Sequence, residues 1–289
     1  MKLRRTLAAG LVAVVAVTGL SACSGKDGTT VKIGTTDSEK KVWKVLEEKA
    51  SEQGINIEMV PFSDYNTPND ALAQGALDLN LFQHLKFLAT YNVGADKDLT
   101  PIGASEIVPL GLYWKDHENL DGIEGQEVAI PNDSSNQGRA INVLVQAKLV
   151  TLKEPNIITP TPADIDEGKS KVTVRGVDAA NTTTAFNEGR PAVINNNFLD
   201  RAGIEPKQAV FKDDPNSTEA EPYINVFVAR NEDRENPTYQ KIVEIFHDPE
   251  VIQANSEDSR GTNVAVDRPA NELADILKRL EDDERQNKS

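Results

Sequence analysis

The chain has 289 residues, enough for one large domain or two ordinary lobes, and its 38% hydrophobic and 27% charged residues are typical of a folded globular protein. A formal net charge of −15 argues against a nucleic-acid partner, because binding phosphates needs a basic surface. One Cys excludes an internal disulfide, a Cys-based zinc site and an iron–sulfur cluster, and with only three His we expect no metal and no cofactor.

The first 22 residues have the pattern of a secretory signal peptide. Lys2, Arg4 and Arg5 precede an apolar run at 7–20, which is too short for a comfortable membrane span. The string LSAC that ends at Cys23 resembles a bacterial lipobox, which implies cleavage before Cys23 and acylation of that residue. The alternative is an ordinary secretory signal with a leftover Cys. We therefore expect a lipid-anchored protein on the extracytoplasmic face of the cell membrane, periplasmic if an outer membrane exists.

The segment 23–30 is rich in Gly, Ser and Thr and suits a flexible tether between the anchor and a folded body. Strands and helices then alternate. The pattern predicts strands at 31–34, 55–60, 77–82, 107–114, 127–130, 172–175, 191–194 and 223–229. It predicts a helix that begins near Asp37 and Ser38 and stops at Gly54, a short helix at 68–73, and helices at 135–149, 181–188, 238–247 and 271–285. Strands separated by helices imply parallel sheets and an α/β fold.

A first group of candidate site residues follows two of the predicted strands, where open α/β sheets place their ligands. Tyr65, Phe82, His84 and Phe87 could form an aromatic wall around an apolar side chain. The alternative is that Phe82 and Phe87 belong to the core and that His84 is a satisfied surface residue.

A second candidate is Arg139, which follows a strand and a loop rich in helix-capping residues. Backbone N–H groups at a helix start favour an anion, and an Arg in the first turn could clamp a carboxylate with two parallel hydrogen bonds. A cation there opposes the helix dipole, so it needs an anionic partner. That partner could equally be an Asp or Glu of this acidic chain.

A third group consists of Asn195 and Asn225, each at or near the end of an apolar strand. An amide offers both an acceptor and donors, which suits the ammonium and carboxylate of a free amino acid. The alternative is turn chemistry, which could fully explain the adjacent Asn196 and Asn197.

Taken in order, the strings FSDYNTPNDAL, DLNLFQH, PNDSSNQGR, AVINNNF and PYIN resemble the NlpA/MetQ family of methionine-binding lipoproteins, the substrate-binding components of ABC importers. The resemblance runs from about Val31 to about Gly261. It implies a two-lobe periplasmic-binding-protein fold of type 2, with a hinge and a ligand cleft between the lobes. It also implies that the first lobe is discontinuous. Polar and charged connections near 115–125, where a new strand–helix series begins, indicate the boundary, so we expect the first lobe at 31–112 plus 228–289 and the second lobe at 113–227.

The resemblance further implies roles for individual residues. Tyr65, Phe82, His84 and Phe87 would line the methionine side chain, Arg139 would bind the carboxylate, and Asn195 and Asn225 would hold the head group. The expected partners are L-methionine or a related amino acid, and an ABC permease with its ATPase. One departure is that Leu85-Lys86-Phe87 stands where many members have Lys-Pro-Tyr, so the phenol hydroxyl is missing.

Two other classes of protein are alternatives, a secreted hydrolase and a surface adhesin lipoprotein. The sequence has no Gly-x-Ser-x-Gly elbow, no His-Glu-x-x-His and no Walker phosphate loop. Its three His, at 84, 117 and 247, lie in unrelated contexts. We therefore expect a binding protein without catalytic residues.

Overall fold

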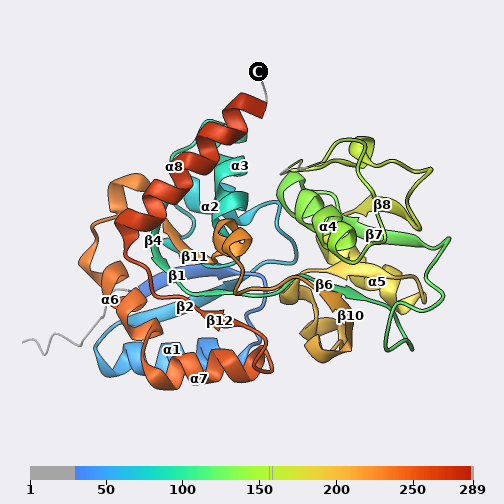
Figure 1. Cartoon of the computed structure of the whole chain (residues 1–289). Coiled ribbons are helices and arrows are strands. Elements are labelled where there is room, and N and C mark those ends of the chain that lie inside the picture. The colour runs from blue at the N-terminus through green and yellow to red at the C-terminus, as the bar shows by residue number, and fades with distance from the viewer. Residues whose placement is uncertain (1–29, 156, 158, 288–289) are drawn as a thin grey trace, which may run out of the picture.

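The computed structural model describes residues 30–155, 157 and 159–287. The predicted signal peptide, the predicted lipidation site Cys23 and all of the predicted tether except Thr30 lie outside these residues. Within them the chain forms two lobes, each built on a five-stranded sheet (Figure 1). No helix in the described part of the chain is long and apolar enough to cross a membrane.

The sheet of the first lobe combines strands from both ends of the chain. Its order is β2 (Asn56–Pro61), β1 (Thr30–Thr35), β3 (Leu79–Asn80), β11 (Val226–Ala229) and β4 (Thr100–Ala104). β1 runs parallel to β2 and β3, whereas β11 runs antiparallel to β3 and β4. Successive side chains of β11 point to opposite faces of the sheet, as in any strand. Phe227 therefore packs into the hydrophobic core on one face and Val228 into the core on the other.

Helices cover both faces of this sheet (Figure 1). One face packs against α1 (Lys41–Glu52), α6 (Pro237–Phe246) and α7 (Pro249–Asp258). The other packs against α2 (Pro68–Ala73), α3 (Leu85–Ala95) and α8 (Ala270–Asn287). The C-terminal helices therefore complete the lobe that the N-terminal strands begin.

The sheet of the second lobe has the order β10 (Ala209–Lys212), β6 (Gly111–Tyr113), β9 (Ala192–Ile194), β7 (Glu127–Pro131) and β8 (Thr173–Val177). The helices α4 (Ser134–Gln146) and α5 (Thr182–Asn187) pack on opposite faces. The chain passes between the lobes after β4 and again after β10. A two-stranded sheet of β5 (Glu106–Ile107) and β12 (Val264–Ala265) lies beside the first crossing.

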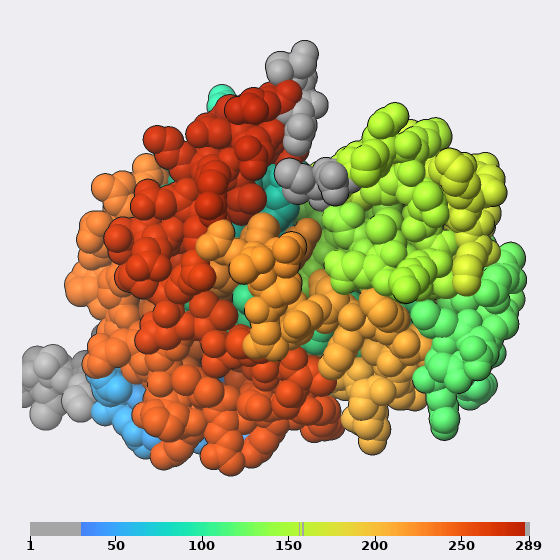
Figure 2. All heavy atoms as spheres, in the orientation of Figure 1, coloured from blue at the N-terminus to red at the C-terminus, as the bar shows by residue number. Residues whose placement is uncertain are grey.

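Short 3-10 turns complete the described chain. They are η1 (Pro162–Asp164), η2 (Ala179–Asn181), η3 (Asn196–Phe198), η4 (Asp200–Ala202), η5 (Pro206–Gln208), η6 (Thr218–Tyr223) and η7 (Asn231–Asp233). In Figure 2 the orange segment that contains η6 lies over the junction of the two lobes on the face shown.

Several predicted elements are wrong in detail. The sheets are mixed rather than parallel, because β11 and β6 pair antiparallel with strands of their own sheets. The expected strand at 107–114 is two strands, β5 and β6, separated by a segment whose Pro109 has no N–H for a ladder. The expected strand at 223–229 begins only at Val226. The predicted lobe limit at 112 falls inside β6, and the limit at 227 falls inside β11.

The helix predicted from Asp37 begins later, at Lys41, because the Asp37 side chain accepts a hydrogen bond from Thr35 and pairs with Lys40 rather than capping the helix. The predicted elements also lack β4, β10, β12, α3 and α7. The N-cap of α3 is His84, which is not among the favoured capping types. By contrast, α7 does have the usual local signal, a capping Asp248 followed by Pro249 at the first helical position.

Candidate functional site

A pocket lies between the two lobes and is lined by side chains from both. All seven residues that the sequence analysis proposed for ligand binding line it. Its full lining consists of Tyr65, Phe82, Gln83, His84, Phe87, Val108, Pro109, Leu110, Asn136, Arg139, Asn195, Asn196, Asn197 and Asn225.

The first lobe contributes an aromatic wall. The ring centroids of Tyr65, Phe82 and Phe87 lie 5.7 to 5.8 Å from one another, at tilted or edge-on angles. Phe198, from the second lobe, packs 4.9 Å from Tyr65. These spacings are those of favourable aromatic pairs, so the rings hold one another in place. Phe82 is buried and Phe87 partly buried, and both contact the pocket as well as neighbouring rings.

His84 joins this wall to the start of α3. Its Nδ1 accepts a hydrogen bond from the backbone N–H of Phe87 at 3.1 Å, and its Nε2 lies 3.3 Å from Oδ1 of Asn136 in the second lobe. Burial, reinforced by the charge of Arg139, lowers the pKa of His84 to about 3. The imidazole is therefore neutral near pH 7. The interpretation of His84 as a surface residue is wrong, since only 6% of it is exposed.

Arg139 lies on the opposite wall and is 4% exposed. Its Nε donates to Oδ2 of Asp213 at 2.8 Å, its Nη2 donates to the carbonyl of Val108 at 2.9 Å, and its guanidinium lies 4.1 Å from the ring centre of Tyr223. The salt bridge that the sequence analysis kept as an alternative is thus present in a residue that also lines the pocket. A guanidinium has five N–H donors, and these two contacts leave others for a ligand.

The placement of Arg139 within its helix corrects the prediction. α4 begins at Ser134, so Arg139 lies in the second turn rather than the first, where the helix dipole opposes a cation less. Asp133 caps the helix, and its Oδ1 accepts the backbone N–H of Asn136 at 2.9 Å. That N–H group is consequently not open to a ligand anion, contrary to what the sequence suggested for the start of this helix.

The two Asn residues have different surroundings. Asn195 donates through Nδ2 to Oδ1 of Asn136 at 2.8 Å, while its own Oδ1 is buried with no partner among the described residues. Asn225 lies at the crossing between the lobes, where its backbone N–H donates to the carbonyl of Glu106 at 2.8 Å. Its side-chain Nδ2 lies 3.4 Å from the same carbonyl, which leaves the amide oxygen of Asn225 for another partner.

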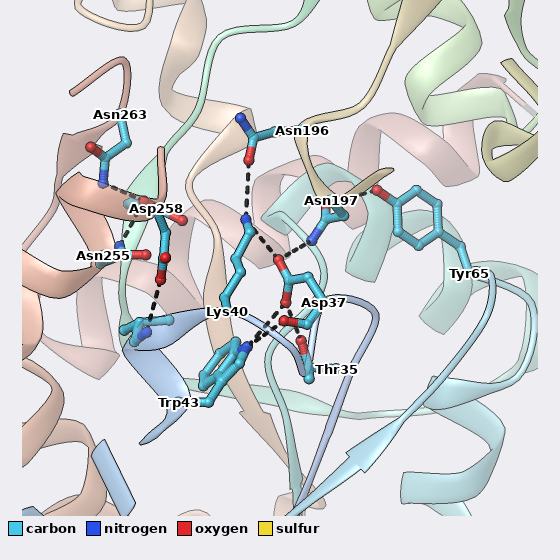
Figure 3. Close-up of polar contacts among 12 residues, drawn as sticks. Thr35, Asp37, Lys40, Trp43, Tyr65, Asn196, Asn197, Asn255, Asp258 and Asn263 are labelled. Carbon is cyan, nitrogen blue, oxygen red and sulfur yellow. Dashed lines mark hydrogen bonds and ion pairs between the residues drawn. The ribbon is translucent and has the colours of Figure 1, made fainter. Parts of the chain in front are cut away.

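A polar network next to the pocket connects the lobes (Figure 3). The Tyr65 hydroxyl donates to Asn197 at 2.8 Å, and Asn197 donates in turn to Asp37 at 3.2 Å. Asp37 pairs with Lys40 at 2.9 Å, and Lys40 donates to Asn196 at 3.2 Å. Asn196 and Asn197, which the sequence could explain as turn residues, therefore bridge from the second lobe to the first.

The charges of this network are buried. The side chains of Asp37 and Lys40 are 7% and 8% exposed. Burial opposes the charge of Lys40, but the attraction of Asp37 and Glu106 outweighs it and raises the pKa of Lys40. Glu106 in turn accepts hydrogen bonds from Asn255 and Asn263. The paired, charged state of Lys40 consequently supports the contact between the lobes. No group of His, Cys, Asp and Glu in the described ranges could hold a metal ion.

Asn136 and Asp213 are two residues around this site that the sequence analysis missed. Asn136 lies in the first turn of α4, within a run of capping-type residues, where local turn chemistry already explains an Asn. Asp213 lies 74 residues from Arg139 in the chain, and nothing in its own surroundings indicates that partner. Only the fold brings Asn136 to the pocket and Asp213 to Arg139.

A pocket enclosed by side chains of two lobes, between which the chain crosses twice, defines a two-lobe ligand-binding protein. The profile of the NlpA lipoprotein family matches residues 31–266, and the chain belongs to that family.

Individual relatives agree with this assignment. The D-methionine-binding lipoprotein MetQ of Salmonella typhi is 30% identical, over 85% of this chain and 92% of its own length. Protein PG110 of Staphylococcus aureus superposes with a TM-score of 0.82 at 35% identity, over 86% of this chain and 99% of that one. The substrate-binding protein of a methionine transporter from Streptococcus pneumoniae gives a TM-score of 0.76 at 31% identity, over 82% and 95%.

Proposed function

We propose that this protein binds methionine or a closely related amino acid and delivers it to the permease of an ABC importer, without catalysing a reaction. The observation that carries the proposal is the convergence of rings from one lobe and polar groups from the other on a single pocket. The relatives named for methionine binding and methionine transport support the choice of ligand.

The polar wall suits the head group of an amino acid. Arg139 would bind the carboxylate through the N–H donors that Asp213 and Val108 do not use. The oxygen of Asn195 would accept from the ammonium, since it is buried without a partner among the described residues. Asn225 would add a further contact from the crossing between the lobes.

The aromatic wall suits a thioether side chain. Tyr65, Phe82 and Phe87 present ring faces and edges to the pocket, and sulfur makes favourable contacts with aromatic rings. Because His84 is neutral, this wall carries no charge that would favour an acidic or basic side chain. An apolar side chain is therefore the best match.

Binding would be coupled to closure of the lobes. A ligand that contacts Arg139 and the rings together favours the closed form, which is a shift of population about a hinge. Hydrogen bonds across the junction, from Tyr65 to Asn197 and from Lys40 to Asn196, would add to the stability of that form. The permease would recognise the closed form, and acylation of Cys23 would keep the protein at the membrane.

Native mass spectrometry of the freshly purified full chain is the first test, because it identifies any small molecule that is retained. Calorimetry with L-methionine, D-methionine, leucine and lysine then ranks the ligands. We expect binding of methionine and no binding of lysine. If no amino acid binds or raises the melting temperature, the protein is not an amino-acid receptor.

A further inference from the structure

The amide of Asn136 touches three site residues, and its orientation can be deduced from two of them independently. From one side, Asp133 is a carboxylate and can only accept, so the Asn136 atom that lies 2.9 Å from it must be the donor Nδ2.

From the other side, His84 leads to the same orientation. Its Nδ1 accepts from the backbone N–H of Phe87, a donor that cannot be reversed, so the hydrogen of the neutral imidazole must be on Nε2. Nε2 then donates to Asn136, and the atom that it meets must be Oδ1. Two anchors from different lobes thus fix the same amide in the same direction.

This direction determines that of the next amide. Asn195 lies 2.8 Å from Oδ1 of Asn136, so the Asn195 atom at that contact must be the donor Nδ2. The Oδ1 of Asn195 is then the atom left over. It is buried, and no described residue donates to it. Asn195 itself lines the pocket, so a ligand is the available source of a donor.

We propose that Asp133 and Asn136 are positioning residues that hold the Asn195 amide with its oxygen toward the ligand, so that the site selects a hydrogen-bond donor at the α-position and rejects a ligand that offers only an acceptor there. This inference rests on the proposed function, because it assumes that the pocket holds the head group of an amino acid. It adds that the selectivity for an ammonium originates in side chains behind Asn195.

Two methionine analogues without the ammonium isolate this effect. 4-Methylthio-2-oxobutanoate has a carbonyl acceptor at the α-position, and 4-methylthiobutanoate has neither a donor nor an acceptor there. Both have the same charge and the same thioether, so the ratio of their Kd values measures only how the site treats an acceptor. In the wild-type protein we expect the oxo acid to bind about tenfold more weakly, because two oxygens face each other in a buried site.

The variant Asn136→Ala removes the acceptor that holds Nδ2 of Asn195, so the Asn195 amide can turn its donor toward the ligand. We expect the oxo acid then to bind at least as tightly as 4-methylthiobutanoate in calorimetry. Asn142→Ala, the same substitution further along α4 and outside the pocket lining, is the matched control and should keep the wild-type ratio. A general loosening of the protein would weaken both analogues and leave their ratio unchanged.

If Asn136→Ala fails to fold, Asn195→Ala tests the oxygen on which the inference rests, since removing that oxygen should abolish the difference between the two analogues. An unchanged ratio in a folded variant that still binds L-methionine overturns the positioning role alone. Failure of the wild-type protein to bind any amino acid overturns the proposed function and this inference with it.

Discussion

The two walls of the pocket are held together by different interactions, ring packing in one and hydrogen bonds in the other. On the first lobe, Tyr65, Phe82 and Phe87 pack against one another, and each ring has several neighbours. On the second lobe, directional hydrogen bonds hold the polar side chains: Arg139 donates to Asp213 and to the carbonyl of Val108, and Asn195 donates to Asn136. The aromatic wall contributes to binding through buried apolar area, which changes little when a ring shifts slightly. The polar wall depends on hydrogen-bond geometry, so the loss of one partner leaves a buried polar group unpaired. We therefore expect changes in the polar wall to affect binding most and changes in the aromatic wall to be graded.

The largest effect is expected from the polar wall. Arg139→Ala should weaken methionine binding by roughly 2–5 kcal/mol, because the ligand carboxylate would be buried without its partner. Calorimetry at pH 7 measures this loss. Arg175→Ala is the control, since Arg175 is 62% exposed and pairs with Glu127 at the surface. Unchanged affinity in the Arg139 variant would show that the carboxylate binds elsewhere.

The aromatic wall should respond less to a single change. Phe87→Ala removes one partly buried ring and should weaken methionine binding by about 1.5–3 kcal/mol, the value of burying such a side chain. Phe87→Tyr keeps the ring and adds a hydroxyl, and it should change affinity by less than about 1 kcal/mol. Equal losses in both variants would mean that the ring area is not what this wall contributes.

His84 belongs to the aromatic wall and contacts Asn136 of the polar wall, and it makes the stability of the protein depend on pH. Its pKa is lowered from the ordinary 6.5 to about 3 by burial and by Arg139, so the unfolded chain binds a proton between these values that the folded chain does not. Stability from this residue is complete above pH 6.5 and is lost as the pH falls toward 3. Between pH 7 and pH 5 the loss is about 2 kcal/mol in the free energy of unfolding.

His84→Asn tests this assignment, because Asn still accepts at the N-cap of α3 but does not titrate. Urea unfolding of the ligand-free protein at several pH values should show a smaller loss of stability in the variant than in the wild type. Parallel curves for the two proteins would mean that His84 is not held neutral by its surroundings.

The smallest effect concerns the link between the walls. Tyr65→Phe keeps the ring but removes the hydroxyl that donates to Asn197 across the junction. We expect methionine binding to weaken by about 0.5–1.5 kcal/mol, the net value of one hydrogen bond, with a faster release of ligand in stopped-flow experiments. A loss as large as that of Arg139→Ala would indicate that Tyr65 contacts the ligand head group directly.

The sequence alone determined what depends on neighbouring residues. The alternation at 55–60 predicted β2, and the capping residues before 135–149 predicted α4. The same local patterns, together with the family resemblance, placed Tyr65, Phe82, His84, Phe87, Arg139, Asn195 and Asn225 near strand ends and helix starts, and all of them line one pocket. α3 escaped prediction because a His caps it, and capping by His has little statistical signal.

Only the tertiary structure decided what depends on residues far apart in the chain. The antiparallel pairing of β11 with β3 and β4 joins segments separated by more than a hundred residues. Hydrophobic periodicity indicates that a segment is a strand, but it does not indicate which strand lies beside it. The same is true of Asp213, which holds Arg139, and of the amide of Asn136, whose direction is set by one anchor in each lobe. A side chain's type limits the hydrogen bonds that it can make, but the fold alone determines which of them it makes.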